Sequence, residues 1–326
     1  MTIICKRYDL STHHTETIEQ SQVASYLKHE QTLLWIEMKF PEDGELDWLS
    51  QTFSLHPATV KMVQEKHGYP SFDWRDDYYV FKSTAVHFDE QHLLHDPVYI
   101  ISSQKYIITV EYQPIGFLAG VRRQWESNEA IEHAALYFTF LIIASIADSY
   151  FEVAHVIRSK SDALRNTSDR SGLMNVPQEI QGLMDYLNEI DLWIFYSMHS
   201  IYVLLRKVEG HSLYSIAAIR IDYQYLESHY KWLGDHVQTD KDILTSLLHQ
   251  FQTHQTDYLN TLVNRLTVVT IILSTAAVIT GFYGINVGGL YPNTNNSKGA
   301  LLVLALIIAL TVILFVLLRP LWKRKS

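Results

Sequence analysis

Two long apolar runs near the C-terminus constrain what this chain can fold into more than any other feature. The first covers residues 266–285 and the second residues 300–318, so they are 20 and 19 residues long. No charged side chain occurs between Arg265 and Lys298. About 20 helical residues, at about 1.5 Å each, span the roughly 30 Å hydrocarbon core of a bilayer. Each run therefore predicts a transmembrane helix, with residues 286–299 as the outer loop between them.

The uneven distribution of charge predicts how these helices are oriented. The formal net charge is −9, of which residues 266–326 contribute +5, so residues 1–265 carry −14. Four of the five positive side chains lie in the tail 319–326, which the positive-inside rule places in the cytoplasm. Two spans return the chain to the side on which it began. We therefore expect a multi-pass protein of an inner or plasma membrane, in contact with lipid, with both termini cytoplasmic.

Composition speaks against several other classes of protein. An acidic body does not suit nucleic-acid binding through a broad basic surface. The single cysteine, Cys5, excludes a disulfide framework and a cysteine-based zinc module. The sequence has no nucleophile elbow, phosphate-binding loop or dinucleotide fingerprint. We therefore expect neither an enzyme nor a bound cofactor.

The first 127 residues have the pattern of an α/β domain. Residues 45–53 and 57–65 have helical periodicity without an internal helix breaker. Strand-like runs occur at residues 3–8, 32–38, 78–88, 98–102 and 106–111. Three residues join the last two runs, which predicts a hairpin. Together these elements predict a cytoplasmic α/β domain over residues 1–127.

The rest of the body is helical. Residues 128–211 predict a hairpin of two long helices, in which the apolar stretch 136–147 is too short to span a membrane and is expected to be buried. Residues 212–265 predict a stalk helix with a break or bend near Gly234. The predicted fold class is an α+β membrane protein. An N-terminal α/β domain is followed by a long stalk helix that continues into the first of two transmembrane helices, within residues 266–326.

One face of the long helix carries small and mostly polar side chains. Every seventh residue from Ser246 and from His249 gives two interleaved series that share a face, as the a and d positions of a heptad do. An ordinary coiled coil places Leu and Ile at those positions. Close contact between transmembrane helices would explain the small residues within the span. A pore wall would also explain the polar residues that precede the span.

We interpret this face, the polar stripe, as a pore wall. Two helices cannot enclose a water-filled path, so a pore requires several copies of the chain around an axis. This predicts a homo-oligomer with the long helix innermost and residues 300–318 facing lipid. The predicted pore-lining residues are Asn260, Val263, Thr267, Thr270, Ser274, Ala277 and Gly281, with His249, Thr253 and Thr256 at the cytoplasmic mouth.

A short motif follows at the outer end of the first span. Gly284 permits close approach near an axis, and Asn286 places a carboxamide at the mouth of the pore. Oxygen ligands suit a hard cation that dehydrates reluctantly, such as Mg²⁺. A tight Zn²⁺ site would require His, Cys or carboxylate, which residues 266–326 do not contain. We therefore expect Asn286 to be the metal-contacting residue and the transported ion to be hydrated Mg²⁺ or Co²⁺.

The motif resembles that of a known family, the CorA-type divalent cation transporters. Tyr283-Gly284-Ile285-Asn286 is similar to the family's Gly-Met-Asn signature, and residues 264–273 are similar to its first span. Residues 34–37, 53–57 and 76–81 resemble its amino-terminal domain. The resemblance implies a homopentamer with a funnel-shaped cytoplasmic domain, an axial pore and a first site for hydrated metal at residues 283–286.

The chain departs from the family in ways that leave the ion open. Ile285 replaces the signature Met, and the first span lacks the usual proline. Lys61 and Met62 stand where magnesium members commonly have an acidic pair that contributes to a Mg²⁺ sensor. Residues 287–290 are similar to the ZntB branch, which is associated with Zn²⁺ and proton coupling. A ZntB-like zinc transporter therefore remains the alternative, and metal-regulated closure remains open.

Three further readings stay open on sequence alone. A membrane-tethered sensor or scaffold, in which the spans only anchor and oligomerise the chain, is the alternative of another class. In a pentamer, Lys323, Arg324 and Lys325 would form a basic ring at the membrane. Along the long helix, Asp240, Asp242 and Asp257 suit either a solvated surface or cytoplasmic cation binding.

Overall fold

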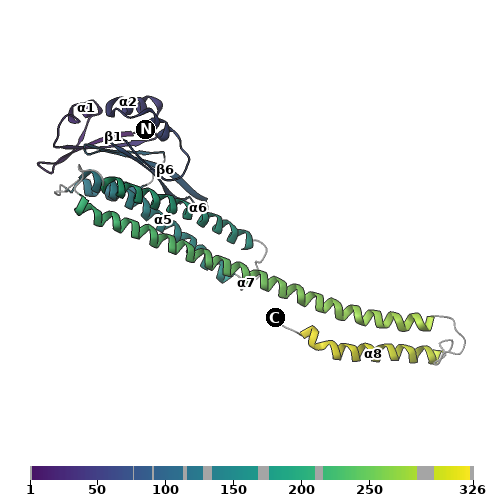
Figure 1. Ribbon diagram of the computed structural model, residues 1–326. Coiled ribbons are helices and arrows are strands. Elements are labelled where there is room, and N and C mark those ends of the chain that lie inside the picture. Colours follow the sequence, from purple (N-terminus) through teal and green to yellow (C-terminus); the bar gives the residue numbers. More distant parts are fainter. Residues whose placement is uncertain are drawn as a thin grey trace. The chain divides into compact units, whose positions relative to one another are not determined.

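The computed structural model describes residues 2–75, 77–89, 92–112, 116–127, 134–167, 176–209, 216–284 and 297–323 (Figure 1). The chain divides into two compact units, Met1–Thr245 and Ser246–Ser326. The first contains a sheet with helices, and the second contains apolar helices. One helix, α7, contributes residues to both units.

The first unit is built on a seven-stranded mixed sheet. The strand order is β2-β1-β3-β7-β6-β5-β4, and only the β3–β7 pair is parallel among these neighbours. The strands β6 and β7 form the hairpin expected from the sequence, with Ser102 opposite Ile107. The strands are β1 (Thr2–Asp9), β2 (Thr15–Ile18), β3 (Thr32–Lys39), β4 (Ser71–Trp74), β5 (Tyr79–Asp89), β6 (His92–Ser102) and β7 (Tyr106–Glu111).

Short helices cover one face of the sheet: α1 (Val23–Tyr26), α2 (Asp43–Phe53) and α3 (Pro57–Gln64), beside the 3-10 turn η1 (Gln20–Gln22). A capping box, in which Glu42 and Glu45 each accept from the other's backbone amide, begins α2. A proline at the first helical position begins α3. The two helices expected at residues 45–53 and 57–65 are therefore confirmed.

One short helix and two long helices cover the other face. They are α4 (Ala119–Trp125), which follows η2 (Gly116–Leu118), α5 (Ala134–Thr167) and α6 (Val176–Glu209). The Tyr150 hydroxyl of α5 donates to the Thr84 carbonyl of β5 over 2.7 Å. Length and composition alone would allow α5 to cross a membrane, but Phe138, Ile142 and Ile146 are at most 1% exposed. The expectation of a buried helix at residues 136–147 is confirmed.

The long helix α7 (Ile216–Gly284) is continuous over 69 residues. The expected break near Gly234 is wrong, because α7 stays helical through this residue. A Cβ added at Gly234 would lie 3.7 Å from the Ile194 side chain of α6, which is an ordinary packing distance. At about 1.5 Å per residue, α7 is roughly 100 Å long.

Two ion pairs tie α7 to its neighbours in the first unit. Arg158 of α5 pairs with Asp240 over 2.5 Å, and Asp191 of α6 pairs with Lys241 over 2.6 Å. Asp240 is only 5% exposed, so its carboxylate depends on Arg158 for compensation.

Replacing Arg158 by Met should lower the free energy of unfolding by about 2 kcal/mol, because it leaves a buried carboxylate without its partner. Urea denaturation of the detergent-solubilised full chain measures this loss. Arg123→Met, at an exposed position of α4, is the matched control and should change stability little. Equal effects of the two substitutions would contradict the role given to the Arg158–Asp240 pair.

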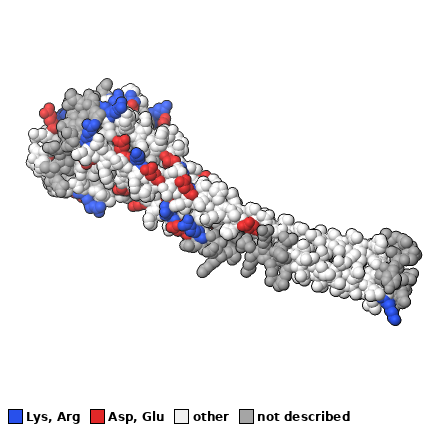
Figure 2. All heavy atoms as spheres, turned by 60° about the horizontal axis from the view of Figure 1, so that its bottom comes forward, with Lys and Arg blue, Asp and Glu red and all other residues white. Residues whose placement is uncertain are grey.

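The second unit contains the C-terminal part of α7 and the helix α8 (Ser297–Lys323), which runs back alongside it (Figure 1). Both helices are long and apolar enough to cross a membrane. Figure 2 shows charged side chains spread over the first unit and an almost uncharged surface on these helices. The prediction of two apolar C-terminal helices is confirmed.

Candidate functional site

The polar stripe lies on an exposed face of α7 in the single chain. Every one of its residues is exposed, and Val263, its largest apolar member within the second unit, is 59% exposed. These residues are His249, Thr253, Thr256, Asn260, Val263, Thr267, Thr270, Ser274, Ala277 and Gly281.

A different face of α7 is covered within the second unit. Val268 is fully buried, while Thr261, Thr275 and Ile279 are half-buried. At about 100° per residue, this face is turned roughly a third of a turn from the polar stripe. In this unit α8 is the neighbouring helix, and its Val303 is also buried. Contact with α8 therefore leaves the polar stripe exposed.

The threonine hydroxyls of the polar stripe donate hydrogen bonds to backbone carbonyls of their own helix. Thr267 donates to the Val263 carbonyl and Thr270 to the Leu266 carbonyl, each over 2.8 Å. Thr253 and Thr256 donate to their own helix in the same way. A hydroxyl has one proton, so each of these oxygens has only electron pairs left for a further partner. The stripe thus offers acceptors, which suits the water shell of a cation.

Packing among the described residues does not require a glycine at position 281. A Cβ added there would meet none of their atoms within 4 Å. The small size of Gly281 would matter where another chain approaches this end of α7, as close helix packing in membranes allows.

The signature segment is only partly described. Tyr283 and Gly284 are the last residues of α7, and the Tyr283 ring lies 5.7 Å from the Phe282 ring. Ile285 and Asn286 lie outside the described residues, as do Arg324 and Lys325. Lys323 is the last residue of α8. The roles assigned to these residues stay predictions.

Two of the three acidic residues singled out along α7 have protein partners. Asp240 pairs with Arg158, and Asp242 accepts from the Gln238 amide over 3.0 Å. Within the described parts of the chain, no group of three His, Cys, Asp or Glu residues is arranged to hold a metal ion. Cation binding by these aspartates therefore has no support from the geometry of one chain.

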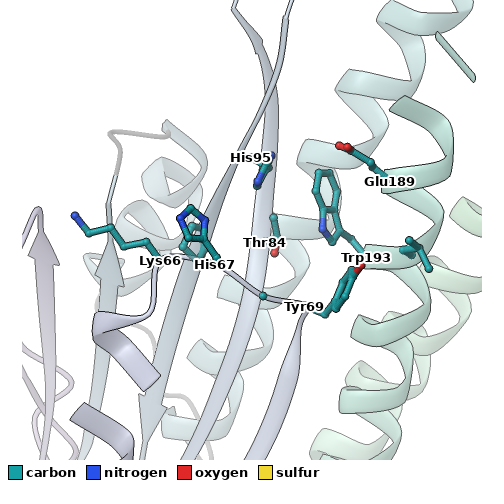
Figure 3. A pocket seen from close by; sticks show the side chains of 10 residues that line it. Lys66, His67, Tyr69, Thr84, His95, Glu189 and Trp193 are labelled. Atoms are coloured by element: carbon teal, nitrogen blue, oxygen red, sulfur yellow. The ribbon is translucent and has the colours of Figure 1, made fainter. Parts of the chain in front are cut away.

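Sequence reasoning missed a cavity of about 330 Å³ in the first unit. It is bounded by the loop after α3, by β5 and β6, and by α6. The Trp193 ring of α6 lies 5.0 Å from the His95 ring of β6, with His67 and Glu189 nearby (Figure 3). These residues come from distant segments without a common spacing, so no sequence pattern pointed to them. Lys82, behind the loop, donates to the His67 carbonyl over 2.6 Å and holds this wall in place.

The chain combines an α/β body with a long helix that carries the polar stripe and continues into the first of two apolar C-terminal helices. This combination defines a class of two-span membrane protein. The chain belongs to the family of CorA-like Mg²⁺ transporter proteins, whose sequence profile matches residues 30–324. The resemblance to CorA-type transporters noted from the sequence is therefore confirmed.

Individual relatives agree with this assignment. The cobalt/magnesium transport protein CorA of Methanocaldococcus jannaschii is 23% identical over 290 residues, covering 86% of this chain and 88% of the relative. The solved structure of the CorA magnesium transporter from that organism matches with a TM-score of 0.80 at 20% identity, covering 100% of this chain and 98% of the other. The ZntB cytoplasmic domain from Vibrio parahaemolyticus matches with a TM-score of 0.61 at 15% identity, covering 79% of this chain and all of the other. At these identities the solved structures establish the fold alone.

Proposed function

We propose that this protein is a homopentameric membrane channel for divalent cations, with hydrated Mg²⁺ as its principal ion and Co²⁺ as a second. The observation that carries the proposal is the exposed polar stripe of α7, whose threonine oxygens are left as acceptors. The metal ion is cargo, and no enzymatic step is involved.

Oligomerisation follows from which face of α7 is covered. The face of α7 against α8 is at least partly buried, whereas the polar stripe is exposed and would be unfavourable in lipid. Several copies around an axis would place the stripe against water. The outward side chains of α8, among them Leu301, Val316 and Leu317, are at least 60% exposed and suit contact with lipid. The number five comes from the family resemblance.

Selection of a hydrated ion follows from the ligands within the pore. The chain from Leu266 to Ser326 contains no carboxylate, thiol or imidazole, so neutral oxygens are its only ligands. Mg²⁺ keeps its water readily, and such oxygens can hydrogen-bond that water. We assign the first contact to Asn286 and the lining to the polar stripe. The roles of Tyr283, Gly284 and Ile285 are to shape this mouth.

The membrane potential supplies the driving force. A charge gains about 2.3 kcal/mol per 100 mV, so a divalent ion gains roughly 4.6 kcal/mol. Inward movement therefore requires no nucleotide. This direction assumes the cytoplasmic placement of both termini that the basic tail favours. Lys323, Arg324 and Lys325 would then form a basic ring at the inner surface.

A zinc transporter with proton coupling is the second candidate, and one structural observation favours it. Met62 packs against the core of the α/β domain and Lys61 is exposed, so neither supplies the acidic ligand that magnesium members commonly have there. Regulation by Mg²⁺ at this position is therefore not expected.

Competitive uptake into liposomes tests both candidates. Purified protein should carry Mg²⁺ and Co²⁺ inward under a negative internal potential, with or without a pH gradient. Zn²⁺ uptake that requires a pH gradient would replace the first candidate by the second. Empty liposomes are the control, and no flux of any of the three metals would overturn both.

A further inference from the structure

A glutamate without a partner is buried at the end of β7. Glu111 is 2% exposed, and neither of its carboxylate oxygens has a hydrogen-bond partner among the residues that the structure describes. Its strand lies between β3 and β6, where Lys39 and Val98 are its direct neighbours. Burying a charged carboxylate without hydrogen bonds is costly, so this position favours the neutral acid.

Glu111 belongs to a row of three buried carboxyl groups. Side chains two residues apart on a strand share a face, so Glu37 of β3 and Asp96 of β6 lie on the same face as Glu111. Glu37 is 1% exposed and Asp96 is 4% exposed. In the described part of the chain, one oxygen of Asp96, Oδ2, also has no hydrogen-bond partner.

The nearest cationic side chains either form ion pairs with other carboxylates or form no ion pair with Glu111. Arg122 of α4 donates to Glu37 Oε2 through Nε at 2.9 Å and Nη2 at 2.6 Å. Lys6 lies 3.6 Å from Glu37 Oε1 and pairs with Glu126 over 3.0 Å. Lys39, directly opposite Glu111, is half-buried and forms no ion pair among the described residues.

The charged groups around Glu111 act in opposite directions on its titration. Burial is the largest effect and raises the pKa of Glu111 to about 7, while Glu37 and Asp96 raise it further and Lys39 and Arg122 lower it. Burial likewise raises the pKa of Asp96, against the influence of His87 and His95. No group of described residues here suits a metal ion. A proton is therefore the remaining way to neutralise Glu111, because Arg122 and Lys6 already compensate the charge of Glu37.

We propose that Glu111 is a proton-responsive switch of the α/β body. Protonated, it lies buried between β3 and β6. When it is ionised, Glu111 attracts Lys39 and competes with Glu37 for Arg122. This competition weakens the Arg122–Glu37 contact that attaches α4 to the sheet.

The packing contacts of α4 could transmit a change at Glu111 to other helices. The Trp125 ring at the end of α4 lies 5.3 Å from the Trp35 ring of β3 and 4.5 Å from the Phe138 ring of α5. The helix α5 is in turn tied to α7 through the Arg158–Asp240 pair. A shift of α4 would therefore reach α5, and through it the helix that carries the polar stripe.

Hydrogen exchange tests the switch in the purified full chain. The folded-state pKa of Glu111 lies above its ordinary value of 4.5, so the folded state binds more protons and its stability falls as the pH rises toward 7. After correction for intrinsic exchange, amides of residues 116–127 should exchange about tenfold faster at about pH 8.5 than at about pH 6. Glu111→Gln, which mimics the neutral acid, should abolish this dependence. Glu30→Gln, at an exposed acid, should retain it.

Infrared difference spectroscopy covers the case in which Glu111→Gln does not fold. The wild-type chain should show the carbonyl band of a protonated carboxylic acid at about pH 6 that disappears by about pH 8.5. Asp96→Asn should keep that band. Wild-type exchange that does not change with pH, pH-dependent exchange in Glu111→Gln, no infrared band in the wild type, or loss of the band in Asp96→Asn would each overturn the proposal. None of these measurements depends on transport, so their outcome is separate from that of the proposed function.

Discussion

Replacing Asn286 by Ala should reduce Mg²⁺ uptake at least about a hundredfold, the loss expected when a contact of about 3 kcal/mol to the hydrated ion is removed from each translocation. The carboxamide is the one oxygen-bearing side chain of the signature proposed to face the hydrated ion. In an oligomer its loss removes an entire ring of ligands at once. Uptake of magnesium into proteoliposomes, measured with a fluorescent indicator, checks this result.

The segment that follows the signature provides a matched control for Asn286. Asn295→Ala removes the same chemical group from the loop outside the signature, and uptake should stay near the wild-type rate. If Asn286→Ala transports normally, or if both variants lose transport alike, the role assigned to Asn286 is wrong.

Replacing Thr270 or Ser274 by Leu should block uptake almost completely. Both residues are exposed on the polar stripe, and the change removes an acceptor and adds apolar volume toward the proposed axis. A ring of leucines would also favour loss of water from the pore. The same uptake assay checks this, with size-exclusion chromatography to show that the oligomer persists.

Val269→Leu is the control for these two substitutions. Val269 is 40% exposed on another face of α7, away from the polar stripe, so a larger apolar side chain there should leave uptake nearly unchanged. A membrane-tethered sensor would tolerate leucine at either place. Normal uptake by Thr270→Leu and Ser274→Leu would therefore contradict the pore-lining role of the polar stripe, and no uptake by the wild-type chain would favour the sensor over the channel.

Most elements of the fold could be predicted from local patterns. The helices α2 and α3 begin at strong local signals, a capping box and a proline. The strands β2 and β4 were missed because each has only four residues, and each exists through pairing with one longer strand. Strands that short carry too few alternating residues to be distinguished from loops.

The candidate site could be predicted in part. The polar stripe was visible because heptad spacing is a property of one helix, and the structure leaves that face exposed. The break expected at Gly234 was wrong because one glycine costs a helix only about 1 kcal/mol, and contacts of α7 with other helices offset that cost. The metal role considered for Asp240 depended on its surroundings in the same way, since Arg158 comes from α5.

The sequence by itself determined the membrane part of this protein. Transfer of an uncharged helix into lipid is a sum over about 20 consecutive residues, so no distant contact is needed to recognise it. Only the tertiary structure decided the state of Glu111. In the sequence it ends an ordinary strand-like run, and nothing nearby marks it as buried. Glu111 is buried because β7 lies between β3 and β6 in the sheet, while α4 supplies Arg122 nearby. These segments are distant in the sequence, and only their packing together excludes water from the carboxyl group.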